Sequence, residues 1–327
     1  MKSRFVRLLA TGIFRILVPA AFFAYVFHVI QIHDVLVALD GMDWSWFLAG
    51  CLCVLFPLHL SSLRTKELVA RRDLRIVRLW MIHAMSSLIG GALPFRTGEL
   101  AYVYYLRRYC GIAISEGTAV WVSFRFMEYV IALALLFCLS AAALVSEPSP
   151  LFWTIVVLIG ANLLGSLFVV WKIDVVYQLL GGAARLLARR RPFSRLGGLV
   201  AGRIDTFVRQ VGDAFSRNAS ARLLFLSSGI VILRYSFILA MVCSMGAPMS
   251  LGLATFLFVF LYAAKFVQGV GSFGSQEAGI AAALMLCGMS QVEALPVAIG
   301  THLLQWAPIL GLGILGYIGL RLPWVRS

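Results

Sequence analysis

The stretch LFWTIVVLIGANLLGSLFVVW, residues Leu151–Trp171, is the clearest indication of fold class, because it is long, apolar and free of charged side chains. A helix needs about 20 mainly apolar residues to cross the hydrocarbon core of a bilayer. The whole 327-residue chain has this character, with 61% hydrophobic residues, 13% charged residues and a mean hydropathy of +0.93. Soluble domains carry about 25% charged residues. The composition therefore excludes a soluble globular protein and predicts an all-α polytopic membrane protein.

Six apolar runs in the chain are long enough to span a membrane. The first run follows Lys2, Arg4 and Arg7 and has no small-residue cleavage site after it, which predicts an uncleaved anchor. We therefore expect six transmembrane helices, at Gly12–Ile30, Trp44–Leu63, Ser115–Val145, Leu151–Trp171, Leu223–Gly246 and Ala294–Leu320.

Two further apolar runs are each followed by a glycine-containing break and a short helical piece. Ile76–Leu93 precedes Glu99–Cys110, and Leu251–Val270 precedes Glu277–Cys287. At about 1.5 Å per residue each piece reaches less than about 20 Å, whereas the hydrocarbon core is about 30 Å thick. Each broken region therefore either crosses the membrane once or enters and leaves by the same face.

The distribution of charge favours entry and exit by the same face. With both broken regions re-entrant, most of the 28 Lys and Arg residues fall on one face, including the basic loop 172–222. Basic loops remain on the cytoplasmic side of a membrane. We therefore expect six transmembrane helices plus two re-entrant broken helix hairpins, with both termini cytoplasmic. The opposite face then carries only acidic charges, at Asp34, Asp40, Asp43, Glu147 and Glu293.

The basic loop contains apolar residues at helical spacing from Leu196 to Val211, directly after Arg189–Arg191. Two interpretations are open. A basic amphipathic helix binds anionic headgroups of the inner leaflet, whereas a plain basic loop only enforces topology.

The two broken regions also resemble each other in the order and spacing of their residues. Arg125 follows Gly111 at the same interval as His302 follows Gly288. Two predicted spans lie between the long helices that carry Arg125 and His302, so these two helices, and the elements matched with them, run in opposite directions. We therefore expect an inverted repeat within a single integral membrane domain. Its halves cover about 44–145 and 223–320 and are joined by the basic loop 172–222.

Matched breaks in two inverted halves are the best sequence indication of a substrate site in a transporter. A helix that begins inside the membrane presents unpaired backbone N–H groups and a positive dipole end, which suit a phosphate. Ionisable residues at membrane depth are costly and usually functional, although Arg125 and Glu128 also have the spacing of a local structural pair. The candidate substrate-binding residues are Arg96, Gly98, Glu99, Arg125, Glu128, Arg234, Lys265, Gly271, Gly274, Glu277 and His302.

The sequence gives no indication of metal or nucleotide chemistry. His59, His83 and His302 lack the spacing of metal ligands, and no Ser-His-Asp order or nucleotide-binding glycine loop occurs. The six cysteines lie mostly in apolar runs, where they serve as small packing residues. We expect no catalytic residues, no metal, no cofactor and no nucleic-acid partner.

The motifs at the two breaks resemble a known family. The stretches LPFRTGE at Leu93–Glu99 and GSFGSQEAG at Gly271–Gly279, with Arg107–Gly111 and Arg125, are similar to the lysylphosphatidylglycerol synthetase transmembrane-region family of flippase-like membrane proteins. This resemblance implies binding or movement of anionic lipids, including polyprenyl-phosphate carriers. It also implies departures: His302 stands where the family often has an arginine, and the second break lacks a proline. Because the sequence ends at Ser327, we expect the stand-alone form without a soluble synthetase domain.

Taken together, these features predict a flippase-like protein, not an enzyme, of the bacterial inner membrane. We expect it to bind or translocate an anionic or polyprenyl-phosphate-linked lipid, whose phosphate docks between the breaks with Arg96, Arg125 and Lys265 as counter-charges. Glu99 and Glu277 would then orient these cations or exchange protons. Two alternatives remain open. One is a secondary transporter of a small anion. The other is an intramembrane enzyme, or a lipid-presenting subunit that has a membrane glycosyltransferase as its partner.

Overall fold

A computed structural model describes residues 32–69, 73–92, 97–146, 150–171, 220–264 and 274–322 of the chain. These parts form helices and no strands. The predicted first span, Gly12–Ile30, and the basic loop 172–222 up to residue 219 lie outside the described residues. The helices are α2 (Ile32–Asp40), α3 (Trp44–Val69), α4 (Ile76–Ala92), α5 (Thr97–Cys110), α6 (Ile114–Ser146), α7 (Pro150–Trp171), α10 (Ser220–Ser244), α11 (Leu251–Ala264), α12 (Ser275–Leu286) and α13 (Gln291–Gly319).

Four of the described helices, α3, α6, α10 and α13, are long and apolar enough to cross a membrane. Each corresponds to a run predicted from the sequence to span. A fifth predicted run, Leu151–Trp171, forms α7, which has 22 residues. The expectation of an all-helical polytopic membrane protein is therefore confirmed, while the count of six spans stays a prediction.

Each broken region contains a pair of short helices. The first pair is α4, with 17 residues, and α5, with 14 residues. The second pair is α11, with 14 residues, and α12, with 12 residues. At 1.5 Å per residue they measure about 18 to 26 Å, less than the hydrocarbon core of about 30 Å. The described parts of both broken regions are thus short helices, and the breaks between them and the re-entrant path of the chain remain predictions.

The two short helices α5 and α12 end in the same way. Gly111 follows α5 with a φ of 66°, and Gly288 follows α12 with a φ of 93°. Both values lie in the left-handed region, where glycine closes a helix without the steric penalty of a Cβ atom. A long helix, α6 or α13, begins soon after each glycine. The short helix, glycine and long helix predicted twice from the sequence therefore occur twice in the structure.

The chain divides into two compact units, each assembled from separate stretches of sequence. The first unit comprises Met1–His59, Trp80–Tyr102 and Ile232–Ser327, and the second comprises Leu60–Leu79 and Val103–Val231.

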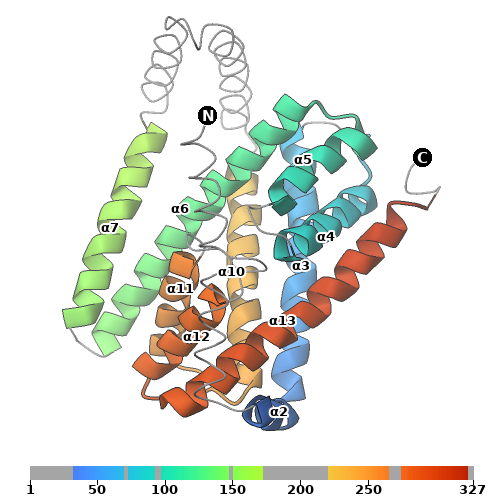
Figure 1. Cartoon of the computed structure of the whole chain (residues 1–327). Coiled ribbons are helices and arrows are strands. Elements are labelled where there is room, and N and C mark those ends of the chain that lie inside the picture. Colours follow the sequence, from blue (N-terminus) through green and yellow to red (C-terminus); the bar gives the residue numbers. More distant parts are fainter. Residues whose placement is uncertain are drawn as a thin grey trace, which may run out of the picture. The chain divides into compact units, whose positions relative to one another are not determined.

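In the first unit, α13 packs against α2, α4 and α12, and α11 packs against α12 (Figure 1). Three glycines near the end of α13, Gly313, Gly316 and Gly319, allow α4 to approach closely. A Cβ atom on Gly316 would lie 2.8 Å from the carbonyl oxygen of Met81, and one on Gly319 would lie 2.7 Å from the Met81 sulfur. Small residues of this kind permit close backbone contact between membrane helices. Next to this contact, Leu58, Ala84 and Leu312 form a buried apolar core.

In the second unit, α6 and α7 form an antiparallel helical hairpin (Figure 1). The Tyr129 hydroxyl donates a hydrogen bond of 3.1 Å to the side-chain oxygen of Asn162, and a Cβ atom on Gly160 would lie 3.2 Å from the Phe137 ring. α5 meets the start of α6 at Gly117, where a Cβ atom would lie 3.4 Å from Val103. These contacts hold the helix that carries Arg125 and Glu128.

Candidate functional site

Two buried polar clusters lie on the long apolar helices, one in each compact unit. The first, here called the Arg64 cluster, joins α3, α6 and α10 and comprises Arg64, Arg125, Glu128 and Ser227. The second, here called the His302 cluster, joins α12 and α13 and comprises Gly274, Gln276, Glu277, His302, Gln305 and Trp306. Most of the candidate residues that the structure describes lie in one of these clusters.

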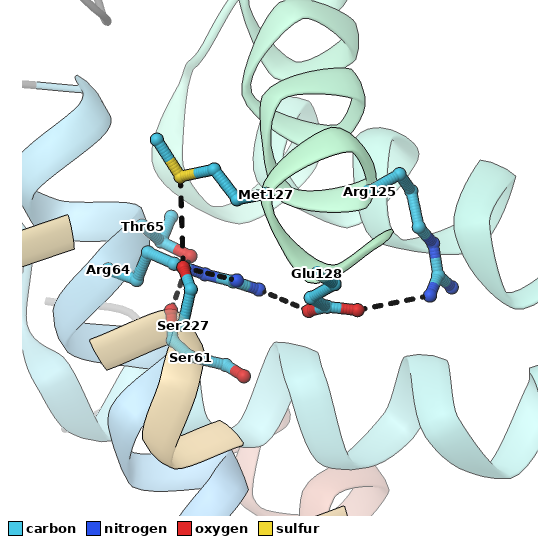
Figure 2. A network of polar contacts seen from close by, with 7 residues as sticks. All are labelled: Ser61, Arg64, Thr65, Arg125, Met127, Glu128 and Ser227. Atoms are coloured by element: carbon cyan, nitrogen blue, oxygen red, sulfur yellow. Dashed lines mark hydrogen bonds and ion pairs between the residues drawn. The ribbon is translucent and has the colours of Figure 1, made fainter. Parts of the chain in front are cut away.

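Arg64 is the centre of the first cluster and is 1% exposed. Its Nη2 atom lies 2.6 Å from Oε1 of Glu128, and its Nη1 atom donates a hydrogen bond of 3.0 Å to the Ser227 hydroxyl (Figure 2). The guanidinium carbon also lies 3.8 Å from the centre of the Phe124 ring, in a cation–π arrangement. A buried charge is tolerated when it is paired and hydrogen-bonded in this way. The cluster therefore keeps an arginine charged inside a helical core.

Glu128 accepts from a second arginine through its other oxygen. Its Oε2 atom lies 3.3 Å from Nη1 of Arg125, one turn earlier on α6 (Figure 2). The local pair considered from the sequence is therefore present, but the shorter and more buried contact of Glu128 is with Arg64. Two arginines around one carboxylate leave a net charge of +1. The Arg125 side chain is 48% exposed, so the surplus charge lies at an accessible part of the cluster.

Arg64 and Ser227 are site residues that were not expected from the sequence. Arg64 directly follows the predicted span Trp44–Leu63, a position where a basic residue ordinarily marks the cytoplasmic end of a span. In the structure α3 continues to Val69, and Ser61, Ser62, Arg64 and Thr65 are all buried. A weak signal was present in the sequence, because the small hydroxyl residues Ser61, Ser62 and Thr65 lie close to this arginine.

Glu277 is the centre of the second cluster and is 1% exposed. Its Oε1 atom lies 2.7 Å from Nδ1 of His302, and its Oε2 atom accepts a hydrogen bond of 2.8 Å from the backbone N–H of Gly274. Gly274 precedes α12 and has a φ of 83°, a left-handed conformation that favours glycine. The carboxylate therefore both caps the start of α12 and holds the histidine of α13.

His302 is also fixed through its second ring nitrogen. The indole N–H of Trp306 lies 3.2 Å from Nε2 of His302, one turn away on α13. The Trp306 ring in turn lies next to α4, because a Cβ atom on Gly91 would lie 3.2 Å from it. The cluster thus extends from the first turn of α12 to the last residues of α4. The end of α4 borders the first predicted break, and the start of α12 borders the second.

Side-chain amides complete the His302 cluster. The Gln276 amide nitrogen donates a hydrogen bond to the side-chain oxygen of Gln305. The amide nitrogen of Gln305 and the hydroxyl of Thr301 are buried and have no hydrogen-bond partner among the described residues. Buried polar atoms of this kind call for an explanation, because leaving one unsatisfied costs about 1 to 3 kcal/mol.

Gly98 and Glu99 lie in the first turn of α5. Gly98 is buried against α4, where an added Cβ atom would lie 2.5 Å from the Cα atom of Gly90. The Thr97 hydroxyl donates a hydrogen bond of 3.5 Å to the Ile89 carbonyl. Glu99 is half-buried. The glycine of the first motif therefore has a packing role, which brings the start of α5 onto the end of α4.

The remaining candidates are placed less closely. Arg234 lies on an exposed face of α10, in the unit that contains the His302 cluster. Arg96, Lys265 and Gly271 lie outside the described residues. Within the described ranges, no group of three His, Cys, Asp or Glu side chains is arranged to hold a metal ion.

Long apolar helices with paired charges in their interior define a multi-pass α-helical membrane protein. The family model of the lysylphosphatidylglycerol synthase TM region matches residues 8–313, and the chain belongs to this family. The family suspected from the break motifs is therefore confirmed. Among curated proteins, none matches the chain.

Proposed function

We propose that the protein binds an anionic lipid, or a polyprenyl-phosphate-linked headgroup, and moves it between the leaflets of the bacterial inner membrane. The observation that carries this proposal is the Arg64 cluster. It places two arginines and one carboxylate on α3 and α6, which are long and apolar enough to span, and it exposes about half of the Arg125 side chain. A guanidinium group binds phosphate through paired hydrogen bonds.

Arg125 is the proposed phosphate-binding residue of this cluster, and Arg64 and Glu128 are positioning residues. Glu128 holds the Arg125 guanidinium from one side, and the buried Arg64 offsets the negative charge of Glu128. Without Arg64 the carboxylate would neutralise Arg125 and weaken the attraction for a phosphate. The arrangement therefore keeps Arg125 oriented without cancelling its charge.

The membrane topology belongs to the same proposal. Six spans, two re-entrant hairpins related by an inverted repeat and cytoplasmic termini would bring broken helices to the middle of the membrane. Transporters bind their substrates at such breaks. The two occurrences of a short helix, a left-handed glycine and a long helix support this arrangement.

Native mass spectrometry of the detergent-purified protein tests the binding step. We expect the wild type to retain anionic lipids and the Arg125→Gln variant to lose them. The matched control is Arg222→Gln, which removes an exposed arginine of the same unit that pairs with Glu67 at 2.7 Å. Equal loss of lipid in both variants would indicate a general charge effect, and equal retention in both would contradict the assignment of Arg125.

A further inference from the structure

The His302 cluster contains an unbroken line of hydrogen bonds through one buried imidazole. The Gly274 N–H donates to one oxygen of Glu277, the other oxygen lies 2.7 Å from Nδ1 of His302, and Nε2 of His302 lies 3.2 Å from the Trp306 indole nitrogen. His302 is 4% exposed and Glu277 is 1% exposed. The proposed binding of phosphate by Arg125 does not involve these hydrogen bonds.

The hydrogen-bond partners fix the position of the proton on the ring. An indole nitrogen donates and never accepts, so Nε2 of His302 must accept with its lone pair. The ring hydrogen is therefore on Nδ1, where it donates to Glu277, and the imidazole is neutral. A proton added to Nε2 would turn that atom into a donor. The new N–H would face the Trp306 N–H, and the hydrogen bond between the two rings would be lost. The positively charged ring would then form an ion pair with Glu277.

Glu277 is a titratable side chain in direct contact with the His302 ring. Gln305 and Gln276, which complete the cluster, are uncharged amides. Gly300, half a turn before His302 on α13, faces Met245 and Leu39, which are uncharged. Histidine is the side chain that most often carries a proton reversibly in proteins, which makes this pair a candidate proton-binding site.

A change at His302 would act on both helix ends that flank the breaks. Trp306 packs against Gly91 near the end of α4, and Glu277 caps Gly274 at the start of α12. Pro296 and Pro308 lie on either side of His302 in α13. Each proline removes one hydrogen bond of the helix, which lowers the cost of bending there.

We propose that the Glu277–His302 pair is a proton-binding site that couples lipid movement to the proton gradient. This inference rests on the proposed lipid movement for its consequence, but not for the proton site itself. A proton from water on one side of the membrane adds to Nε2, whose lone pair forms the new N–H bond. The proton leaves to the other side when the ring returns to the neutral state, and no other bond forms or breaks.

Tryptophan fluorescence of the purified full chain tests the proton site. An imidazolium next to an indole quenches its emission, and subtracting the spectrum of Trp306→Phe isolates the signal of Trp306. We expect a one-proton transition in the wild type when the pH is varied. His302→Gln should abolish the transition, whereas the control His83→Gln, which alters a histidine stacked on Tyr102, should keep it. The absence of a transition in the wild type, or its persistence in His302→Gln, would overturn the proposal.

Proteoliposomes with a fluorescent phosphatidylglycerol test the coupling. An imposed pH gradient should accelerate lipid movement several-fold in the wild type and in His83→Gln, and should have no effect in Glu277→Gln or His302→Gln. Trp306→Phe keeps the Glu277–His302 pair and replaces these variants in the experiment if either fails to fold. We expect Trp306→Phe to lose most of the acceleration by the pH gradient. Lipid movement that ignores the gradient in the wild type would overturn the coupling. If the wild type moves no lipid at all, the proposed function fails, and the fluorescence titration still decides whether the pair binds a proton.

Discussion

Glu277 and His302 lie 2.7 Å apart through Oε1 and Nδ1, although they belong to two helices and are separated by 25 positions in the chain. Glu277 is in the first turn of the short helix α12, and His302 is near the middle of the long helix α13. The pair therefore connects the start of the short helix α12 to a helix long and apolar enough to span. In the second unit the Arg64–Glu128 pair connects two long helices, α3 and α6.

The Arg64–Glu128 pair predicts a large loss of stability when one partner is removed. Arg64→Met leaves the buried carboxylate of Glu128 without its closest counter-charge, which costs about 3 to 5 kcal/mol for pairs of this kind. Thermal unfolding in detergent measures the effect. The double variant Arg64→Met/Glu128→Leu should recover part of the loss, and Arg222→Gln, at an exposed ion pair, should change stability little. An Arg64→Met protein as stable as the wild type would show that the pair is not structural.

The close contact of α13 with α4 predicts opposite effects for two glycines of the same helix. Gly316→Ala would place a Cβ atom 2.8 Å from the carbonyl oxygen of Met81, so we expect a loss of about 1 to 3 kcal/mol. Gly311 has no atom within 4 Å of such a position, and Gly311→Ala should be neutral or stabilising by up to about 1 kcal/mol. The two melting temperatures, measured side by side, check this contrast. Equal melting temperatures would mean that the helices do not meet as described.

The left-handed conformation of Gly288 predicts that substitutions there lower stability through backbone strain alone. Gly288 has a φ of 93° and open space around it, so a side chain there meets strain without a clash. Gly288→Val should destabilise by roughly 1 to 2 kcal/mol, and Gly288→Asn by less, because asparagine tolerates this region better. The ranking of the two variants by thermal unfolding provides the measurement. Greater stability of the valine variant would contradict the conformation.

The proposed topology predicts the sidedness of two exposed positions. In a background without native cysteines, Val292→Cys lies beyond the second broken region and should react with an impermeant maleimide added outside intact cells. Arg107→Cys lies at the end of α5 and should react only after the membrane is permeabilised. Labelling of Arg107→Cys from outside would show that the first broken region crosses the membrane once.

Much of the fold was predictable because its signals are local in sequence. Apolar runs such as Trp44–Leu63 indicate helices by composition alone, and glycine at 111 and 288 indicates a helix end by its backbone freedom. The family also followed from short motifs at the two breaks, and it is confirmed over residues 8–313.

The site was only partly predictable, because burial and pairing depend on helices distant in sequence. Arg64 has the sequence neighbourhood of a topology marker, and only the packing of α3 with α6 and α10 reveals its partners Glu128 and Ser227. Glu277 and His302 were both candidates, but nothing in their spacing indicates that each oxygen and each ring nitrogen has its own partner. The packing role of Gly98 against Gly90 was likewise invisible, since the contact joins two helices across a break.

The central claim, that this protein moves an anionic lipid with Arg125 as its phosphate-binding residue, is tested most directly by the rate of lipid movement in proteoliposomes. A fluorescent phosphatidylglycerol is quenched in the outer leaflet by an impermeant reductant, and the rate of exchange from the inner leaflet is measured. We predict faster exchange with the wild type than in protein-free vesicles, a loss of that gain in Arg125→Gln, and a rate equal to wild type in Arg222→Gln. A wild-type protein that gives no gain over protein-free vesicles, or an Arg125→Gln variant as fast as wild type, would contradict the claim.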